Sequence, residues 1–90
     1  MDERLTKPPA GVDLGPVSAR IFEVLAEHTA FPWPVMKTQA QRLGLDPANL
    51  TMTDLRALLD LLAVSVERFT SPRTGAKTRE DLERLLARGV

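Results

Sequence analysis

The segment from Leu50 to Phe69 constrains the fold more than any other part of the chain, because its apolar residues cover two faces of the helix that it would form. Residues three and four positions apart lie on the same face of a helix. The first stripe contains Leu55, Leu58, Leu59, Leu62, Val66 and Phe69, and the second contains Ala57, Leu61 and Val64. A helix with two apolar faces needs packing partners on two sides. We therefore expect this segment to lie at the centre of a helical domain.

Prolines and glycines divide the preceding part of the chain into shorter helices. Pro16 suits a first helical turn, and the apolar spacing after it predicts a helix over residues 16–29. The prolines of Phe31-Pro32-Trp33-Pro34 must interrupt that helix, because proline lacks an amide hydrogen and pushes the residue before it toward an extended conformation. A second helix is expected from Pro34, and Gly44 is well placed to turn left-handed after its end.

Two capping patterns mark the expected starts of the last two helices. In Thr51-Met52-Thr53-Asp54 the threonine can accept a hydrogen bond from the amide three residues on, while the acidic side chain reaches back. Thr78-Arg79-Glu80-Asp81 repeats the pattern, which predicts a last helix from Thr78 after a loop over residues 71–77. No segment alternates with the period of a strand. The sequence therefore predicts an all-α fold, a small four-helix bundle with a long central helix.

The domain organisation follows from composition and length. Residues 1–15 contain two adjacent prolines, two glycines and few apolar residues, so they are expected to form a flexible N-terminal leader. Residues 16–90 are expected to form a single helical domain, because a chain of 90 residues has room for one small core.

The residue types present exclude several kinds of chemistry. The chain has no cysteine, which excludes disulfides, thiolate nucleophiles and cysteine-ligated zinc. It has no tyrosine and one histidine, so acid–base catalysis would fall to carboxylates or lysines. That histidine, His28, has no second histidine or preceding carboxylate at helical ligand spacing. We therefore expect no catalytic residues, no metal site and no cofactor, and we expect that the protein is not an enzyme.

Charge and hydropathy indicate the cellular compartment in which the protein is expected. The first residues are charged and contain no apolar run, which is unlike an ordinary secretory signal, and no stretch has the eighteen or so apolar residues of a membrane span. A cytoplasmic protein with no membrane partner is expected. Nine arginines against three lysines, with abundant leucine and alanine, suit a GC-rich bacterial genome.

A basic segment after the central helix is the main polar candidate site. Arg68, Arg73, Lys77 and Arg79 lie within twelve residues, and Thr78 adds a hydroxyl near an expected helix start, where free amides favour an anion. This loop over residues 68–79 could bind phosphate, a nucleic-acid backbone or an acidic partner. Twelve basic and twelve acidic residues give the chain no net charge, which argues against nucleic-acid binding as its main role.

A second candidate for nucleic-acid binding lies just before the central helix. Residues 39–45 are similar to the first helix and turn of a helix-turn-helix, with Gly44 in the expected place. The next helix would then have to read bases, but its outward residues include Asp54, Asp60 and Glu67, which repel phosphate. Any helix-turn-helix here would be degenerate.

The leading hypothesis is a non-enzymatic protein-interaction or regulatory domain that acts through an apolar helical surface. Three short helices are not expected to cover both stripes of the central helix, which leaves Leu61 and Val64 for self-association as a homodimer or for a partner protein. Trp33 and Phe31 of the proline-rich break form a further candidate contact site, in which Trp33 either covers the core or anchors a partner. The alternative function is binding of a nucleic acid or phosphate ligand through the basic loop.

Overall fold

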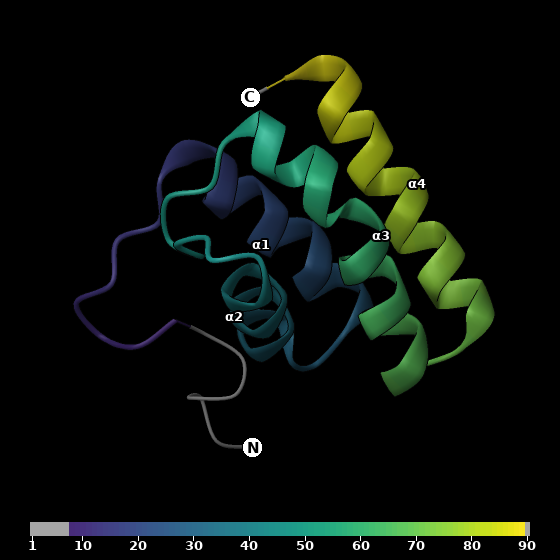
Figure 1. The fold of residues 1–90 in the computed structure, drawn as a ribbon. Helices are drawn as coiled ribbons and strands as arrows, with labels where there is room; N and C mark the ends of the chain where they lie inside the picture. Colours follow the sequence, from purple (N-terminus) through teal and green to yellow (C-terminus); the bar gives the residue numbers. More distant parts are fainter. Residues whose placement is uncertain (1–7, 90) are drawn as a thin grey trace.

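The computed structural model describes residues 8–89 and consists of four α-helices (Figure 1). The helices are α1 (Pro16–His28), α2 (Pro32–Arg42), α3 (Met52–Phe69) and α4 (Pro72–Arg88). Residues 8–89 contain no strand, so the predicted all-α four-helix fold is confirmed. No helix among these residues has the length and apolar character needed to cross a bilayer.

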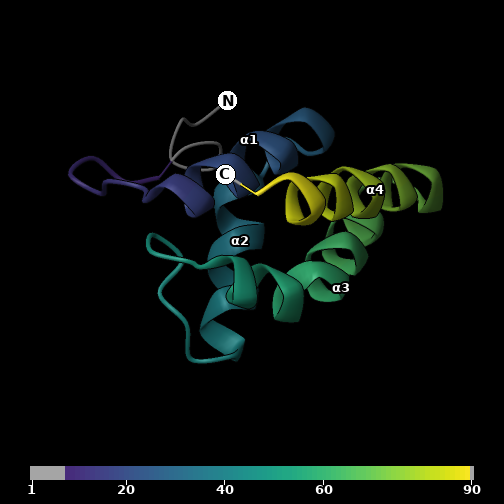
Figure 2. The same cartoon turned by 90° about the horizontal axis from the view of Figure 1, so that it is seen from above.

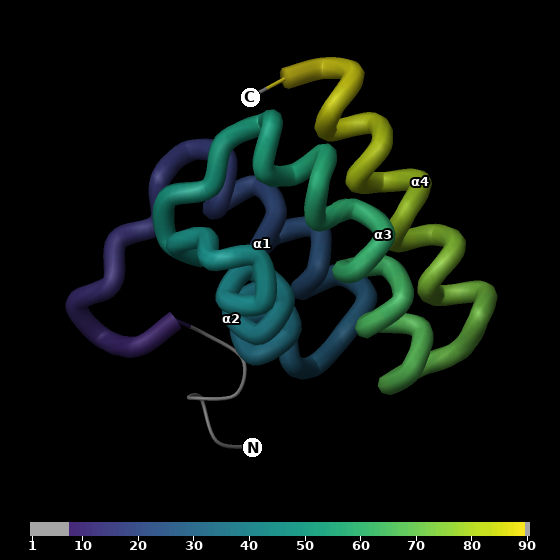
Figure 3. Tube along the Cα trace, in the orientation of Figure 1, coloured from purple at the N-terminus to yellow at the C-terminus, as the bar shows by residue number. Residues whose placement is uncertain are grey.

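The long helix α3 lies at the centre of the bundle, as predicted, and packs against α1, α2 and α4. α3 and α4 run antiparallel, side by side, and are joined by a tight turn (Figures 1 and 3). α2 crosses the other helices steeply, which is clear when the molecule is seen from above (Figure 2). α1 contacts all three other helices.

The start of α2 differs from the prediction by two residues. The helix begins at Pro32 and not at Pro34, so both prolines and Trp33 lie in its first turn. Amides of a first turn have no partner within the helix, and for this reason two prolines can be accommodated there. The break between helices falls earlier, at Thr29, whose hydroxyl accepts a hydrogen bond from the Phe31 amide.

The capping box predicted at Thr51 is present. The Thr51 hydroxyl accepts the Asp54 amide at 3.1 Å, and the Asp54 carboxylate accepts the Thr51 amide at 2.9 Å. Gly44 has a φ of 71°, the left-handed conformation expected after the end of α2.

The prediction that the last helix begins at Thr78 was wrong. α4 begins at Pro72, and Ser71 caps it by accepting the Thr74 amide at 3.1 Å. Ser71-Pro72 is itself a strong start signal, a capping serine followed by proline at the first helical position. The predicted loop over residues 71–77 is therefore the first part of α4, and Thr78 lies buried in the middle of that helix.

The first apolar stripe of α3 forms most of the core, with one exception. Its five leucine and valine residues before Phe69 are buried, whereas the Phe69 side chain is 67% exposed. The second stripe lies near the surface: Ala57 is exposed, Leu61 packs partly against the core and Val64 is 39% exposed. The other core residues are Ile21, Leu25, Trp33, Val35, Met36, Ala40, Leu50 and Leu82.

Two hydrogen bonds join the beginning of α1 and the residue before it to the linker between α2 and α3. The Gly15 amide donates to the Ala48 carbonyl at 2.8 Å, and Leu14 packs against the core. The buried Ser18 hydroxyl, in the first turn of α1, accepts the Leu50 amide at 2.8 Å. Of the predicted leader, residues 1–7 lie outside the described part of the chain, and residues 8–15 contain a turn but no helix.

Candidate functional site

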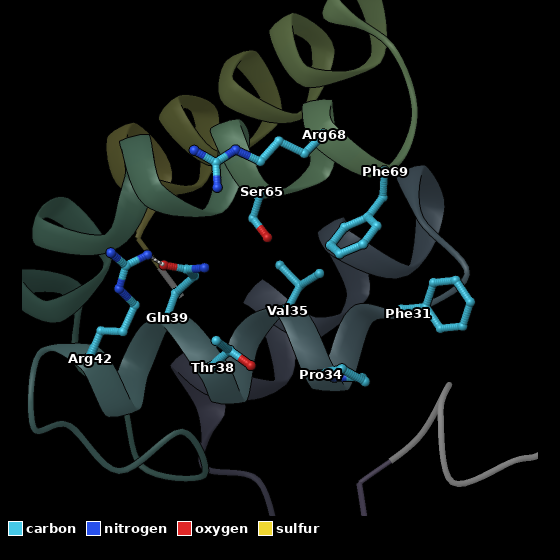
Figure 4. Close-up of a pocket in the computed structure, with 9 residues that line it drawn as sticks. All are labelled: Phe31, Pro34, Val35, Thr38, Gln39, Arg42, Ser65, Arg68 and Phe69. Atoms are coloured by element: carbon cyan, nitrogen blue, oxygen red, sulfur yellow. Dashed lines mark hydrogen bonds between the residues drawn. The ribbon is translucent and has the colours of Figure 1, made fainter.

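A groove with a volume of about 480 Å³ lies between α2 and α3 (Figure 4). Its floor includes Val35 and Gln39 from α2 and Ser65 from α3, all of them largely buried. Pro34 and Thr38 complete the α2 wall. The groove exists because α2 crosses α3 steeply, so the two helices diverge on either side of their contact.

One end of the groove is lined by two exposed aromatic rings. Phe31 precedes α2 and Phe69 ends α3, and their ring centroids are 6.5 Å apart with the planes tilted by 57°. This geometry is within the range of favourable aromatic pairs. Phe69 is the most exposed large apolar side chain described in the structure. Exposed aromatic side chains that border a concave surface are typical anchors for protein partners.

Two arginines flank the groove farther along. Arg42 lies at the end of α2 and Arg68 near the end of α3 (Figure 4). Arg42 donates to Gln39 at 3.4 Å, and neither arginine pairs with a carboxylate among the residues that the structure describes. None of the nine residues that line the groove is acidic. The groove therefore combines a mostly apolar lining with positive charge that has no carboxylate partner among these residues.

The second stripe of α3 continues the wall of this groove. Leu61 precedes Ser65 by four residues, and Val64 precedes Arg68 by four residues, so each pair lies along the same side of the helix. The partly exposed Leu61 and Val64 thus extend the apolar surface beyond the groove. We call Leu61, Val64 and the groove the α2–α3 face.

Trp33, the third predicted interface residue, lies elsewhere. Its side chain is 7% exposed and belongs to the core. It therefore covers the core, which was one of the two roles considered for it. The aromatic contribution to the surface comes instead from Phe31 and Phe69. The sequence indicates Phe31 as a contact candidate beside Trp33, whereas Phe69 follows the spacing of the first apolar stripe of α3.

The predicted basic loop is not a loop, and its members are separated. Arg68 lines the groove, whereas Arg73 and Lys77 are exposed one turn apart on α4. Arg79 forms an ion pair with Asp60 of α3. Thr78 is fully buried, and its hydroxyl donates to the Thr74 carbonyl at 2.8 Å.

The spacing of α2 and α3 also differs from that of a helix-turn-helix. Residues 43–51 separate the end of α2 from the start of α3. A helix-turn-helix joins its two helices by a turn of about three or four residues. The similarity of residues 39–45 to that motif therefore does not extend to the three-dimensional arrangement.

His28 is not an isolated surface residue. Its Nε2 atom lies 2.6 Å from Oδ2 of Asp81 on α4, and the two side chains are 13% and 26% exposed. The neighbouring Glu27 carboxylate lies in the same cluster. The sequence did not indicate this contact, because the two partners are 53 residues apart and only the packing of α1 on α4 brings them together.

Comparison of the chain with known protein families, with curated proteins and with solved structures gave no match.

Proposed function

We propose that this chain is a non-enzymatic protein-interaction domain, and that its α2–α3 face binds an acidic amphipathic helix of a partner protein. The observation that supports this proposal best is the groove itself. It joins a mostly apolar lining, which includes two exposed phenylalanines, to two arginines that have no carboxylate partner among residues 8–89.

The apolar part of the face suits a helical ligand. Grooves between two helices commonly bind the apolar stripe of a third helix through residues spaced by three or four positions. Phe31 and Phe69 stand at one end of such a track, and Leu61 and Val64 extend it along α3. Burial of these side chains would supply the hydrophobic part of the binding free energy.

The charged part of the face favours an acidic ligand. Arg42 and Arg68 would meet carboxylates on the flanks of the bound helix, and such pairs increase the association rate and select among partners. Lys37 is also exposed on α2, so this helix carries two positive charges and no acidic residue.

The same charges make a symmetric homodimer a weaker candidate than a separate partner. In a two-fold dimer the same patch faces itself. Two copies joined through the groove would bring Arg42 and Arg68 of one chain toward those of the other, and like charges across an interface are unfavourable. Self-association through Leu61 and Val64 alone would avoid this conflict but would bury a smaller apolar area.

Nucleic-acid binding through the predicted basic residues has less support. Arg79 is paired with Asp60, and the Thr78 hydroxyl is buried. Two of the five residues predicted to bind an anion therefore do not present an available side-chain group to solvent. Arg73 and Lys77 remain as an exposed pair on α4. Two cations would give only a shallow salt dependence of binding, since that dependence grows with the number of phosphates neutralised.

The proposal can be tested with synthetic helical peptides. One peptide carries leucine and phenylalanine at every third and fourth position and glutamate on the flanks, and its matched counterpart carries lysine on the flanks. Fluorescence anisotropy is expected to show that the acidic peptide binds at least about tenfold more tightly, a difference of roughly 1.4 kcal/mol. Amide NMR signals of Thr38 and Ser65 are expected to shift on binding, because both residues line the groove.

Substitutions of exposed apolar residues provide the control. Phe69→Asp is expected to weaken peptide binding at least about tenfold. Leu43→Asp changes another exposed large apolar residue, which does not line the groove, and should leave binding unchanged. Equal binding of both peptides would support the groove as the binding site but would contradict the proposed preference for an acidic partner. If neither peptide shifts the groove signals, the proposed site is wrong.

Two further outcomes would identify a different occupant. A dimer detected by light scattering, insensitive to salt and dissociated by Val64→Asp, would assign the face to a second copy of the chain. Binding of a DNA oligonucleotide that is lost on the double change Arg73→Glu and Lys77→Glu would favour the nucleic-acid function.

A further inference from the structure

Glu27, His28 and Asp81 form a second cluster, on the α1–α4 side of the molecule. Glu27 and His28 end α1, and Asp81 projects from α4. One potential ligand atom from each of the three residues lies within 4.8 Å of the others. We propose that these residues bind a divalent transition-metal ion, and that Zn²⁺ is the ion that fits best.

The donor set indicates the class of ion. One imidazole nitrogen and two carboxylate oxygens suit Zn²⁺ and related first-row ions, whereas Ca²⁺ and Mg²⁺ prefer oxygen ligands alone. Three protein ligands with water in the remaining position is a common arrangement for an open zinc site. The chain has one histidine and no cysteine, so any zinc site with an imidazole or thiolate ligand must include His28.

Only a small rearrangement would be needed to admit the ion. Two ligands of a tetrahedral zinc, each about 2.0–2.1 Å from the metal, lie roughly 3.3 Å apart. His28 Nε2 and Asp81 Oδ2 are 2.6 Å apart, so this pair would have to open by less than 1 Å. Their partial burial limits the positions that the two side chains can take, while the exposed Glu27 has the freedom to turn toward the ion.

The cluster is open to solvent on two sides. Glu27 and Asp81 line a hollow of about 380 Å³, and Glu27 and His28 border another of about 480 Å³ on the side of Phe69. An ion could therefore enter without unfolding the domain, and water could fill the free coordination position. The second hollow adjoins the aromatic end of the α2–α3 face, but the metal proposal does not depend on that face.

The surrounding charges both favour and oppose a cation. Glu23 lies one turn before Glu27 and adds negative charge, although Arg20 pairs with it at 3.2 Å. Arg84 opposes a cation most directly, because its Nη1 lies 3.5 Å from Oδ1 of Asp81. Its Nη2 binds Glu80 at 2.7 Å, so Arg84 keeps a partner when a metal takes Asp81. Arg88 lines the same hollow as Arg84.

Calorimetric titration of the EDTA-treated full chain with zinc chloride tests the proposal. We expect one ion per chain and no comparable binding of magnesium chloride. His28→Gln is expected to abolish this binding, and Glu27→Gln is expected to weaken it at least about tenfold, the scale of losing one ligand or its support. Glu23→Gln removes a carboxylate of the same helix face outside the cluster and should change the affinity much less.

Substitution of the neighbouring Arg84 provides a test in which zinc binding is expected to become tighter. Arg84→Gln removes positive charge next to Asp81 and should tighten zinc binding, a result that a purely structural ion pair would not produce. The imidazole NMR signals of His28 should shift on addition of zinc, and the melting temperature of the wild-type chain should rise, because the bound ion would join α1 to α4.

Failure of a variant to fold would be detected by circular dichroism, and Glu27→Gln provides a second variant at an exposed position. No one-to-one zinc binding by the wild-type chain would overturn the proposal. The same conclusion would follow if zinc binding were equal in the wild-type, Glu27→Gln and Asp81→Asn chains.

Discussion

Gly75 of α4 lies against Glu67 of α3 so closely that a Cβ atom added to the glycine would stand 2.6 Å from the Glu67 Cβ. It would also lie 3.2 Å from the Glu67 Cα and from the Ala63 carbonyl oxygen, so backbone as well as side chain limits the space. This glycine has an ordinary helical conformation and is needed for its small size alone. The close approach of α3 and α4 depends on it.

We predict that Gly75→Ala destabilises the protein even though alanine is the better helix former. The propensity gain is about 1 kcal/mol, whereas overpacking of a tight contact costs about 1–3 kcal/mol. The expected net loss in the free energy of unfolding is about 1 kcal/mol, measured by urea denaturation. Ala76→Gly, at the exposed neighbouring position, reports the propensity effect alone. A stabilised Gly75→Ala variant would show that the helices can separate at little cost.

Ser18→Ala should cost more than its small change in volume suggests. The Ser18 hydroxyl is buried and accepts the Leu50 amide at 2.8 Å, so its loss leaves a buried donor without its partner. The expected loss is about 1–3 kcal/mol by chemical denaturation. Ser65→Ala is the matched control, because that hydroxyl points into the groove (Figure 4), and a change below about 0.5 kcal/mol is expected there.

Removal of the cap of α3 should have a smaller effect. Thr51→Ala deletes the acceptor for the Asp54 amide and is expected to lower the free energy of unfolding by about 1 kcal/mol. Thr53→Ala, an exposed position in the same helical turn, should leave stability unchanged or raise it slightly, because alanine favours helix. Equal effects of the two substitutions would contradict a capping role for Thr51.

Asp46 should contribute to the acid sensitivity of the protein. Hydrogen bonds to its carboxylate from the Asn49 side chain and from the Ala48 amide lower the pKa of Asp46. The unfolded chain therefore takes up this proton at a higher pH than the folded chain, and the stabilisation is lost as the pH falls through the lowered pKa. Below about pH 4, urea unfolding should show a steeper loss of stability for the wild type than for Asp46→Asn. Parallel pH profiles would contradict this assignment.

The two stripes of α3 should respond differently to truncation. Leu62→Ala removes a fully buried side chain and is expected to cost about 2–5 kcal/mol. Val64→Ala, two residues away, should change stability by no more than about 0.5 kcal/mol, because its side chain is partly exposed. Thermal and urea denaturation of the two variants measure the difference directly. A large loss at Val64 would show that it belongs to the core and not to the α2–α3 face.

Local signals in the sequence determined the helical class, three of the four helix starts to within two residues and the core side of α3. Those features depend on neighbours along the chain: a threonine with an acidic residue three positions on, a proline at a first turn, or leucines spaced by three and four. The predicted start of α4 was wrong because two helix-start signals, one at Ser71-Pro72 and one at Thr78, lie close together in the sequence. Ser71-Pro72 follows directly after the end of α3 and starts α4, whereas the threonine pattern at Thr78 lies within α4.

Tertiary packing decided which surfaces are free and which distant residues meet. Phe69 has the same helical spacing as the buried leucines, but it lies at the end of α3, where no helix covers it and where it meets Phe31. Trp33 was buried by the position of α2, and Asp81 reached His28 only because α4 folds back along α1. Hydrophobic periodicity specifies which side of a helix turns inward. The crossing angles and lengths of the other helices determine how much of that side is covered, and these depend on contacts between residues far apart in the sequence.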